Sequence, residues 1–150
     1  MDKGNTNLLL PVGTIAPDWE LPLVTGNTQK LSDLKGKVVI MDFWYKACAP
    51  CQQQMIALQK LHDKYDKSKV AFVGVNTIDD LVKDKLQLFL TKRNITMPNV
   101  YNGKSIIGLY KAYYAPVLYV IDKTGKITYT LEGYSKTLLN DVSGVIEKNL

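Results

Sequence analysis

The stretch that decides the fold is VVIMDFWYKACAPC, residues 38–51, which holds both cysteines of the 150-residue chain. Its first half is a near-continuous apolar run, typical of a strand buried on both faces of a parallel or mixed sheet. The following CQQQMIALQKLHDKY (51–65) has apolar residues at intervals of three and four, which predicts an amphipathic helix. Pro50 suits the first turn of that helix, because its missing N–H has no intrahelical partner there. Cys48 and Cys51 are therefore expected at a strand-to-helix junction.

Further strands and helices alternate along the rest of the chain. The segments expected as strands are a short pair around Gly26-Asn27, then 69–77, and a hairpin of 116–122 and 126–132. The segments expected as helices are 79–94, a short one near 106–112, and 138–150, with an irregular connection over 95–108. Alternating strands and helices, followed by a hairpin, predict an α/β fold with a mixed central β-sheet flanked by helices.

Composition sets the limits on domain number and partners. An apolar content of 46% is enough for one compact core, which we expect over residues 11–150, with 1–10 as a loose leader. No apolar run approaches the ~20 residues of a membrane span. We expect that any export signal or anchor is missing from this chain. The net charge of +5 comes from scattered lysines and one arginine, Arg93, which argues against a nucleic-acid partner.

The cysteine pair has three possible roles: two ligands of a metal site, a structural disulfide or a redox couple. A structural disulfide that closes so small a loop restricts the unfolded chain little, and a fold of this size does not need one. Zinc usually takes four ligands, whereas this chain has only two cysteines and one histidine, His62, eleven residues beyond Cys51. Neither a metal nor another cofactor is therefore expected. A redox couple remains the favoured interpretation.

Position alone gives the two cysteines unequal roles. A helix N-terminus favours negative charge, so Cys48 is expected to react as the thiolate nucleophile. Cys51 lies one turn later on the core-facing side, where it is expected to resolve the mixed disulfide. Asp42 is the one ionisable residue of the apolar strand, and burial raises the pKa of a carboxyl group. It is either a buried proton acceptor for Cys51 or a residue at the exposed end of the strand.

Three segments resemble thioredoxin-like proteins. VVIMDFWYKACAPC is similar to their active-site segment, and APVLYVIDKTGKI (115–127) to their cis-proline strand. VGTIAPDWELPL (12–23) with LSDLKGK (31–37) resembles the TlpA/ResA-type branch of the redoxin/AhpC-TSA-like superfamily, thiol–disulfide oxidoreductases found outside the bacterial cytoplasm. The resemblance covers about residues 11–149. It implies a thioredoxin-like fold with an N-terminal β-hairpin, a central insertion around 95–112, and a cis peptide at Ala115-Pro116 facing the cysteines.

Several positions depart from the pattern of that family. Ala47 stands where Trp is common, so the surface beside Cys48 is expected to be more open, with Trp44 and Tyr45 as the remaining apolar cover. Gln54 replaces a functional glutamate of ResA-like members. Gly74 replaces the usual lysine partner of the buried aspartate. Together with Ala115 and Pro116, we take Trp44 and Tyr45 as the substrate-binding residues.

The resemblance implies a thiol–disulfide oxidoreductase of the protein-disulfide reductase type, using Cys48 and Cys51 as a redox-active disulfide. The expected partners are protein thiol and disulfide substrates and an upstream redox partner. The expected location is the periplasm or another extracytoplasmic space, with a cytoplasmic location as the alternative. Two other functions stay open: a peroxiredoxin-like thiol peroxidase, which the APDWELP opening also resembles, and a non-catalytic thioredoxin-like binding module.

Overall fold

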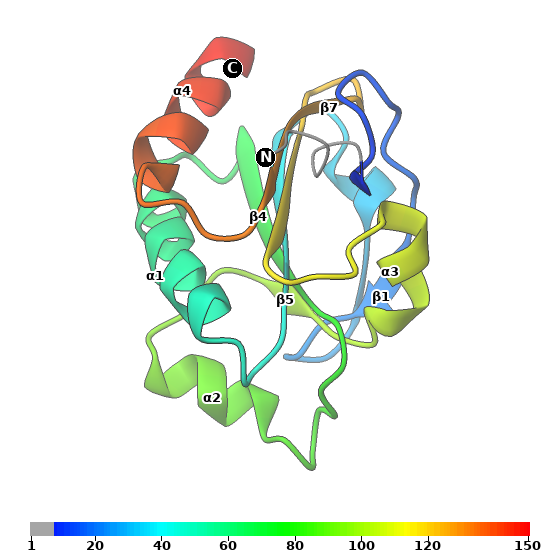
Figure 1. Cartoon of the computed structure of the whole chain (residues 1–150), viewed down its shortest axis with the longest axis vertical. Helices are drawn as coiled ribbons and strands as arrows, with labels where there is room; N and C mark the ends of the chain where they lie inside the picture. Colours follow the sequence, from blue (N-terminus) through cyan, green and yellow to red (C-terminus); the bar gives the residue numbers. More distant parts are fainter. Residues whose placement is uncertain (1–7) are drawn as a thin grey trace.

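A five-stranded mixed sheet forms the centre of the molecule in a computed structural model that describes residues 8–150 (Figure 1). The strand order is β5-β4-β3-β6-β7. The strands are β3 (Val38–Trp44), β4 (Val70–Asn76), β5 (Asn99–Val100), β6 (Val117–Ile121) and β7 (Ile127–Glu132). β3 runs parallel to β4 and antiparallel to β6, so the expected mixed sheet is confirmed. All seven residues of β3 are buried, as a central strand requires.

Helices cover both faces of this sheet. They are α1 (Ala49–Lys64), α2 (Leu86–Lys92), α3 (Lys104–Tyr110) and α4 (Leu138–Asn149), with a 3-10 turn η2 at Leu31–Leu34. One core cluster joins Ile40 and Trp44 of β3 to apolar residues of α1, α2 and α4. The other joins the opposite side of β3 to α3 and the N-terminal segment. Figure 1 shows the same division, with α1 and α4 side by side on one face and α3 on the other.

The N-terminal hairpin is present as expected. β1 (Glu20–Pro22) pairs antiparallel with β2 (Thr28–Lys30). Its turn uses Gly26 and Asn27, both with positive φ, of 107° and 58°. Glycine and asparagine tolerate this left-handed backbone better than other residues, which explains why the pair marks the turn.

Two elements differ from the expectation for residues 79–108. The predicted helix over 79–94 is wrong in its first half, and α2 begins only at Leu86. The Asp80 carboxylate accepts hydrogen bonds from the N–H groups of Val82 and Lys83, and Lys85 has a φ of 50°, so the chain turns before the helix starts. The predicted irregular connection contains β5, a two-residue edge strand that pairs in parallel with β4.

The boundary of the predicted leader also differs. Its residues 1–7 lie outside the described part of the chain, and Leu8 is exposed, but the last two residues pack on the domain. Leu9 is 3% exposed, and the Leu10 N–H donates to the Tyr119 hydroxyl at 3.0 Å. Leu9 belongs to the second core cluster and Leu10 packs against it, so both residues contact the domain. None of the helices in residues 8–150 has the length and apolar character needed to cross a membrane.

Candidate redox-active site

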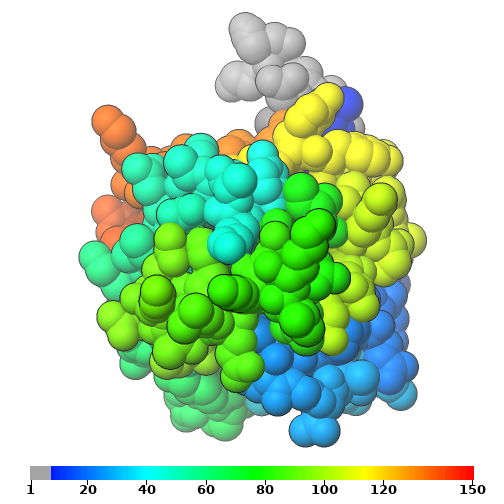
Figure 2. All heavy atoms as spheres, turned by 90° about the horizontal axis from the view of Figure 1, so that it is seen from below, coloured from blue at the N-terminus to red at the C-terminus, as the bar shows by residue number. Residues whose placement is uncertain are grey.

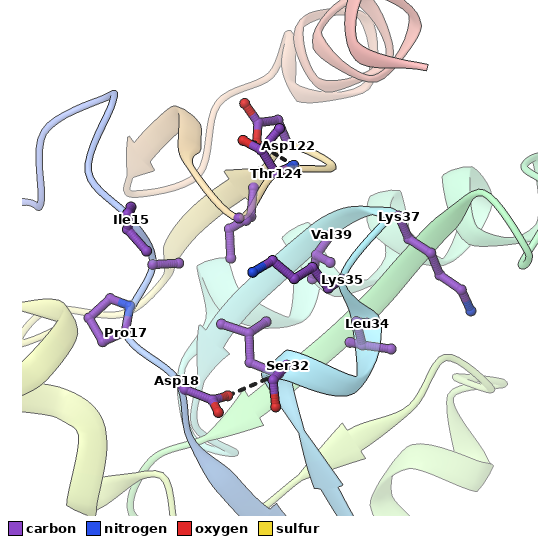
Figure 3. A pocket seen from close by; sticks show the side chains of 14 residues that line it. Ile15, Pro17, Asp18, Ser32, Leu34, Lys35, Lys37, Val39, Asp122 and Thr124 are labelled. Atoms are coloured by element: carbon purple, nitrogen blue, oxygen red, sulfur yellow. Dashed lines mark hydrogen bonds between the residues drawn. The ribbon is translucent and has the colours of Figure 1, made fainter.

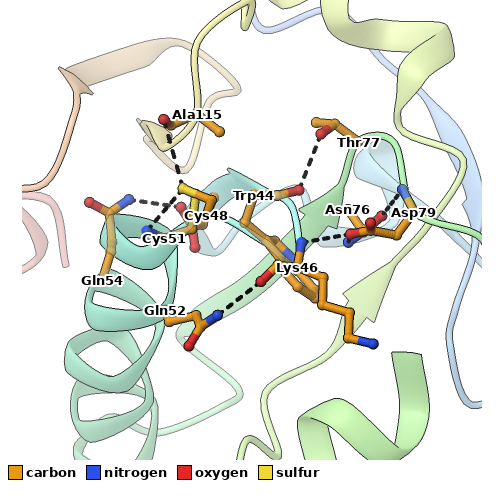
Figure 4. The surroundings of a disulfide bond; sticks show 11 residues. Trp44, Lys46, Cys48, Cys51, Gln52, Gln54, Asn76, Thr77, Asp79 and Ala115 are labelled. Carbon is orange, nitrogen blue, oxygen red and sulfur yellow. Dashed lines mark hydrogen bonds between the residues drawn. A yellow bond between two sulfur atoms is a disulfide. The ribbon is translucent and has the colours of Figure 1, made fainter. Parts of the chain in front are cut away.

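Cys48 and Cys51 form a disulfide at the start of α1, directly after β3 (Figure 4). Cys48 is the N-cap residue, and Pro50 lies in the first turn, as the sequence predicts. The backbone N–H of Cys51 donates to Cys48 Sγ at 3.2 Å. At an N-cap, the free N–H groups and the helix dipole both favour negative charge. The same N–H is therefore in place to stabilise a Cys48 thiolate once the disulfide is reduced.

The two sulfur atoms differ in access to solvent. Cys48 is 5% exposed, whereas Cys51 is fully buried. The residues next to Cys48, Ala47 and Ala49, are exposed. An incoming reagent can therefore reach Cys48 before Cys51, in line with the order of attack expected from position.

The segment that faces Cys48 comes from the other half of the chain. The Ala115–Pro116 peptide bond is cis, as the resemblance implies, and it lies directly before β6. The carbonyl oxygen of Ala115 lies 3.9 Å from Cys48 Sγ (Figure 4). Pro116 is buried, while Ala115 is half-buried. Because β6 pairs with β3, the sheet itself brings this segment beside the cysteines.

Asp42 lies in the middle of the sheet and is completely buried, which excludes the exposed-end interpretation. Burial raises the pKa of its carboxyl group to about 7, although a hydrogen bond from Gln54 acts in the opposite direction. Gln54 Nε2 donates to Asp42 Oδ1 at 2.8 Å. Neither Asp42 Oδ2 nor Gln54 Oε1 has a hydrogen-bond partner among residues 8–150. Gln54 is thus the hydrogen-bond partner of Asp42. Its place in the sequence, where ResA-like members have a glutamate, did not suggest this contact.

Trp44 does not take the substrate-binding place expected for it. Its side chain is fully buried, and its ring stacks on Phe89 with centroids 5.7 Å apart. Its indole N–H donates to Asn99 Oδ1 at 2.8 Å. This prediction is wrong because Trp44 points to the helix-covered side of the sheet, whereas the half-buried Tyr45 stays near the surface.

The structure explains why residue 74 is a glycine, which the sequence does not reveal. It pairs with Asp42 in the β3–β4 register, at the position where the resemblance to thioredoxin implies a lysine. A Cβ added at Gly74 would come 2.0 Å from Asn99 Oδ1 and 3.1 Å from Trp44 Nε1. The position must stay small for the hydrogen bond between Trp44 and Asn99 to form.

A polar loop after β4 fixes the segment that carries Cys48. Asp79 Oδ2 accepts from the backbone N–H of Lys46 at 2.6 Å and from Asn76 Nδ2 at 2.9 Å (Figure 4). Gln52 Nε2 donates to the Lys46 carbonyl at 2.9 Å. The sequence analysis missed Asn76 and Asp79. Their signal was two short polar side chains, one ending a buried strand and one three residues beyond it, at the same edge as the cysteines.

The family follows from comparison with known proteins. Residues 12–130 match the model of the AhpC/TSA family. The chain belongs to the AhpC/TSA family. It is 34% identical over 116 residues to the thioredoxin-like protein YneN of Bacillus subtilis, a match that covers 77% of this chain and 68% of YneN. Together with the ResA relatives, this match makes the chain a TlpA/ResA-type thioredoxin-like protein.

Other relatives of this AhpC/TSA-family protein carry redox names. It is 30% identical to the thiol-disulfide oxidoreductase ResA of Geobacillus kaustophilus, over 81% of this chain and 70% of ResA. A solved structure from Chlorobium tepidum, assigned as a thiol:disulfide interchange protein of the DsbE type, superimposes with a TM-score of 0.83 and 28% identity. That match covers 93% of this chain and 98% of the other. With its cysteine pair at disulfide distance, the chain is a thiol–disulfide oxidoreductase enzyme.

Two other features of this AhpC/TSA-family protein lie apart from the cysteines. A cavity of about 390 Å³ lies at the opposite end of β3, between Pro17, Leu34 and Thr124 (Figure 3). No cysteine lines it, and its Asp18 carboxylate accepts a hydrogen bond from the backbone N–H of Ser32. As for metals, no three His, Cys, Asp or Glu side chains gather anywhere in residues 8–150. His62 packs edge-on against the ring of Phe72.

Proposed function

We propose that this thiol–disulfide oxidoreductase reduces protein disulfides, with Cys48 as the nucleophile and Cys51 as the resolving thiol. One observation carries the proposal: Cys48 caps α1 and receives the Cys51 N–H, while Cys51 is sealed in the core. A helix N-terminus favours the thiolate, and the thiolate is the attacking species. The half of the pair that the helix activates is therefore also the half that a substrate can reach.

The proposed reaction has two exchange steps. The Cys48 thiolate attacks one sulfur of the substrate disulfide, which forms a mixed disulfide and releases the other substrate sulfur as a thiolate. The Cys51 thiolate then attacks Cys48 Sγ, which restores the Cys48–Cys51 disulfide and releases the second substrate sulfur. The substrate gains two electrons, and the enzyme loses two. A thiol reductant or a redox partner returns the enzyme to the dithiol.

Asp42 is proposed as the proton acceptor for Cys51 in the second step. Its support is a buried carboxyl group whose pKa is raised to about 7, so that it can gain and lose a proton near neutrality. Gln54 follows Cys51 by three residues on α1 and donates to Asp42, which ties the carboxylate to the same helix turn. The unpaired Asp42 Oδ2 leaves one oxygen free for a proton.

The substrate chain is proposed to lie across Ala115, Pro116 and Tyr45. The carbonyl of Ala115, a half-buried residue, lies 3.9 Å from Cys48 Sγ and is an acceptor next to the point of attack. A backbone carbonyl at a strand end can pair with the N–H of an extended substrate chain. We also propose that residues 11–150 form one domain, extended by Leu9 and Leu10, and that the enzyme works outside the cytoplasm, which the resemblance to the TlpA/ResA branch supports.

The test uses the reduced wild-type protein and a reduced Cys51→Ser variant. The substrates are native insulin, with its disulfides intact, and a neutral peptide disulfide. The wild type is expected to reduce both substrates with dithiothreitol as the final reductant. The Cys51→Ser variant is expected to stop at a mixed disulfide on Cys48, found by mass spectrometry. A Cys48→Ser variant serves as the matched control and should trap nothing. Trapping by Cys48→Ser, or no mixed disulfide with Cys51→Ser, would overturn the assignment of roles.

A further inference from the structure

A groove of about 490 Å³ opens beside the cysteines, between the segment that precedes α1 and helix α2. Ala47, the residue before Cys48, is exposed and lines it. Figure 2 looks onto this side, where the cyan segment between β3 and α1 lies next to the green segments that include α2. Because alanine has no side chain beyond Cβ, nothing at position 47 closes the groove off from Cys48. The groove therefore begins at the residue next to Cys48 in the chain.

Cationic side chains dominate the lining of this groove. Lys46, Lys85, Lys92 and Arg93 line it, against the carboxylates of two aspartates. Within residues 8–150, none of these four cations lies within 4.0 Å of a carboxylate oxygen. Their charge is therefore not neutralised by any described acidic partner.

The two aspartates of the groove are already engaged with the backbone. Asp79 Oδ2 accepts from the Lys46 N–H and from Asn76 Nδ2. Asp84 Oδ2 accepts from the Asp80 N–H at 2.7 Å. These carboxylates hold the loop before α2 in place, so the lysines and the arginine remain available to an incoming group.

Two of the cations are also held in position. The guanidinium carbon of Arg93 lies 3.7 Å from the ring centre of Phe89, a cation–π contact. Lys46 Nζ donates to the Asp84 carbonyl at 2.9 Å and lies 5.8 Å from the same ring. Phe89 in turn stacks on the buried Trp44. Cations fixed on a rigid aromatic base lose less side-chain entropy on binding than free ones.

We propose that this cationic groove binds an acidic stretch of the substrate protein, a few residues from the cysteine that Cys48 attacks. The inference rests on the proposed reductase function and adds a charge preference to it. Complementary charge speeds encounter and fixes the register of a bound chain. A substrate chain that reaches Cys48 passes the open side at Ala47, and carboxylates on that part of the chain would face Lys85, Lys92 and Arg93.

The test compares three peptides that differ only in two residues placed a few positions from a single cysteine: Asp-Asp, Asn-Asn or Lys-Lys. Each cysteine is activated as a mixed disulfide with 2-thiopyridine. Attack by the Cys48 thiolate on the peptide sulfur forms the enzyme–peptide disulfide and releases pyridine-2-thione, whose absorbance gives the rate. The reduced wild type is expected to react with the Asp-Asp peptide at least about fivefold faster than with the Lys-Lys peptide at low salt. The ratio is expected to approach one in about 1 M salt, where screening is short-ranged.

Variants locate the preference in the groove. In Lys85→Glu/Lys92→Glu, the ratio of the Asp-Asp rate to the Lys-Lys rate is expected to fall to one or below. Arg93→Gln, a neutralising change, is expected to lower the ratio partway. The matched control is Lys123→Glu/Lys148→Glu, which makes the same change in net charge at exposed positions after β6 and near the end of α4, and should keep the wild-type ratio. Circular dichroism checks the fold of each variant.

Two results would overturn the inference while leaving the reductase function standing: equal rates for all three peptides in the wild type, or an equal loss of preference in both double variants. The second result would mean that net charge, and not the groove, sets the rate. If none of the three peptides reacts with the reduced protein, the proposed function fails, and the inference fails with it.

Discussion

At the scale of single residues, Asp42 couples the redox site to pH. Its carboxyl group is fully buried, and its pKa is raised from 3.8 to about 7 in the folded protein. The neutral form is therefore favoured in the fold. The neutral Asp42 carboxyl group leaves the free energy of unfolding at its full value below about pH 4. That free energy falls as pH rises from there through 7, because the unfolded chain ionises first. Above pH 7 the folded protein holds a buried carboxylate with one hydrogen bond, from Gln54.

This gives a prediction for Asp42→Asn in the oxidised protein. At pH 8 the variant is expected to gain up to about 4 kcal/mol in the free energy of unfolding relative to wild type, from about three pKa units at 1.36 kcal/mol each. At pH 4 the two proteins should be nearly equal, because the carboxyl group is then neutral. Urea unfolding at a series of pH values measures both. Exposed Asp33→Asn is the control, and a difference between Asp42→Asn and wild type that does not grow with pH would contradict the account.

Single residues also show which parts of the site can be predicted from the sequence. Asp42, Cys48 and Cys51 were identified because each breaks a pattern: a charge within an apolar strand, or two cysteines at a helix start. Gln54 and Gly74 were noticed only as departures from a family, and their reasons are spatial. Gln54 contacts Asp42 from another element, and Gly74 makes room for Asn99, a residue on a strand that the sequence did not predict.

At the scale of elements, the loop between β4 and α2 is what positions the cysteine segment. The sequence predicted a helix there, over residues 79–94. A turn replaces the first half of that helix, because the Asp80 carboxylate accepts the backbone N–H groups of Val82 and Lys83 and Lys85 has a left-handed φ of 50°. β5 was missed for a related reason, since a two-residue strand has no periodicity to detect.

The second prediction tests this loop. Asp79→Ala removes the acceptor of the Lys46 N–H and of Asn76 Nδ2, both partly buried. We expect a loss of about 1–3 kcal/mol in the free energy of unfolding at pH 7, because a charge-assisted acceptor is lost and its donors are left unpaired. Hydrogen exchange at the Lys46 amide should also speed up. Asp33→Ala, which makes the same charge change at an exposed residue, is the control, and an equal effect of the two variants would contradict this role.

At the scale of the whole molecule, the site exists only because distant segments meet. The sheet order, with β3 between β4 and β6, places Cys48 opposite Ala115 and Trp44 beside Asn99. The sequence predicted most strands, the hairpins and the α/β class, since these depend on local periodicity and turn residues. It did not predict the edge strand or the side of the sheet that Trp44 faces toward α2, because both depend on register between strands far apart in the chain.

The limit of the folded unit gives the last prediction. The leader was expected to be loose up to residue 10, yet Leu9 is 3% exposed within the cluster on the α3 side of the sheet. Leu9→Ala is therefore expected to lower the free energy of unfolding by about 2 kcal/mol or more, since it leaves a cavity in a packed core. Its neighbour Leu8 is 51% exposed, so Leu8→Ala should change it by no more than about 0.5 kcal/mol. Urea unfolding of both variants decides the boundary: equal stability would return Leu9 to the leader, whereas a loss confined to Leu9→Ala places the start of the domain before residue 11.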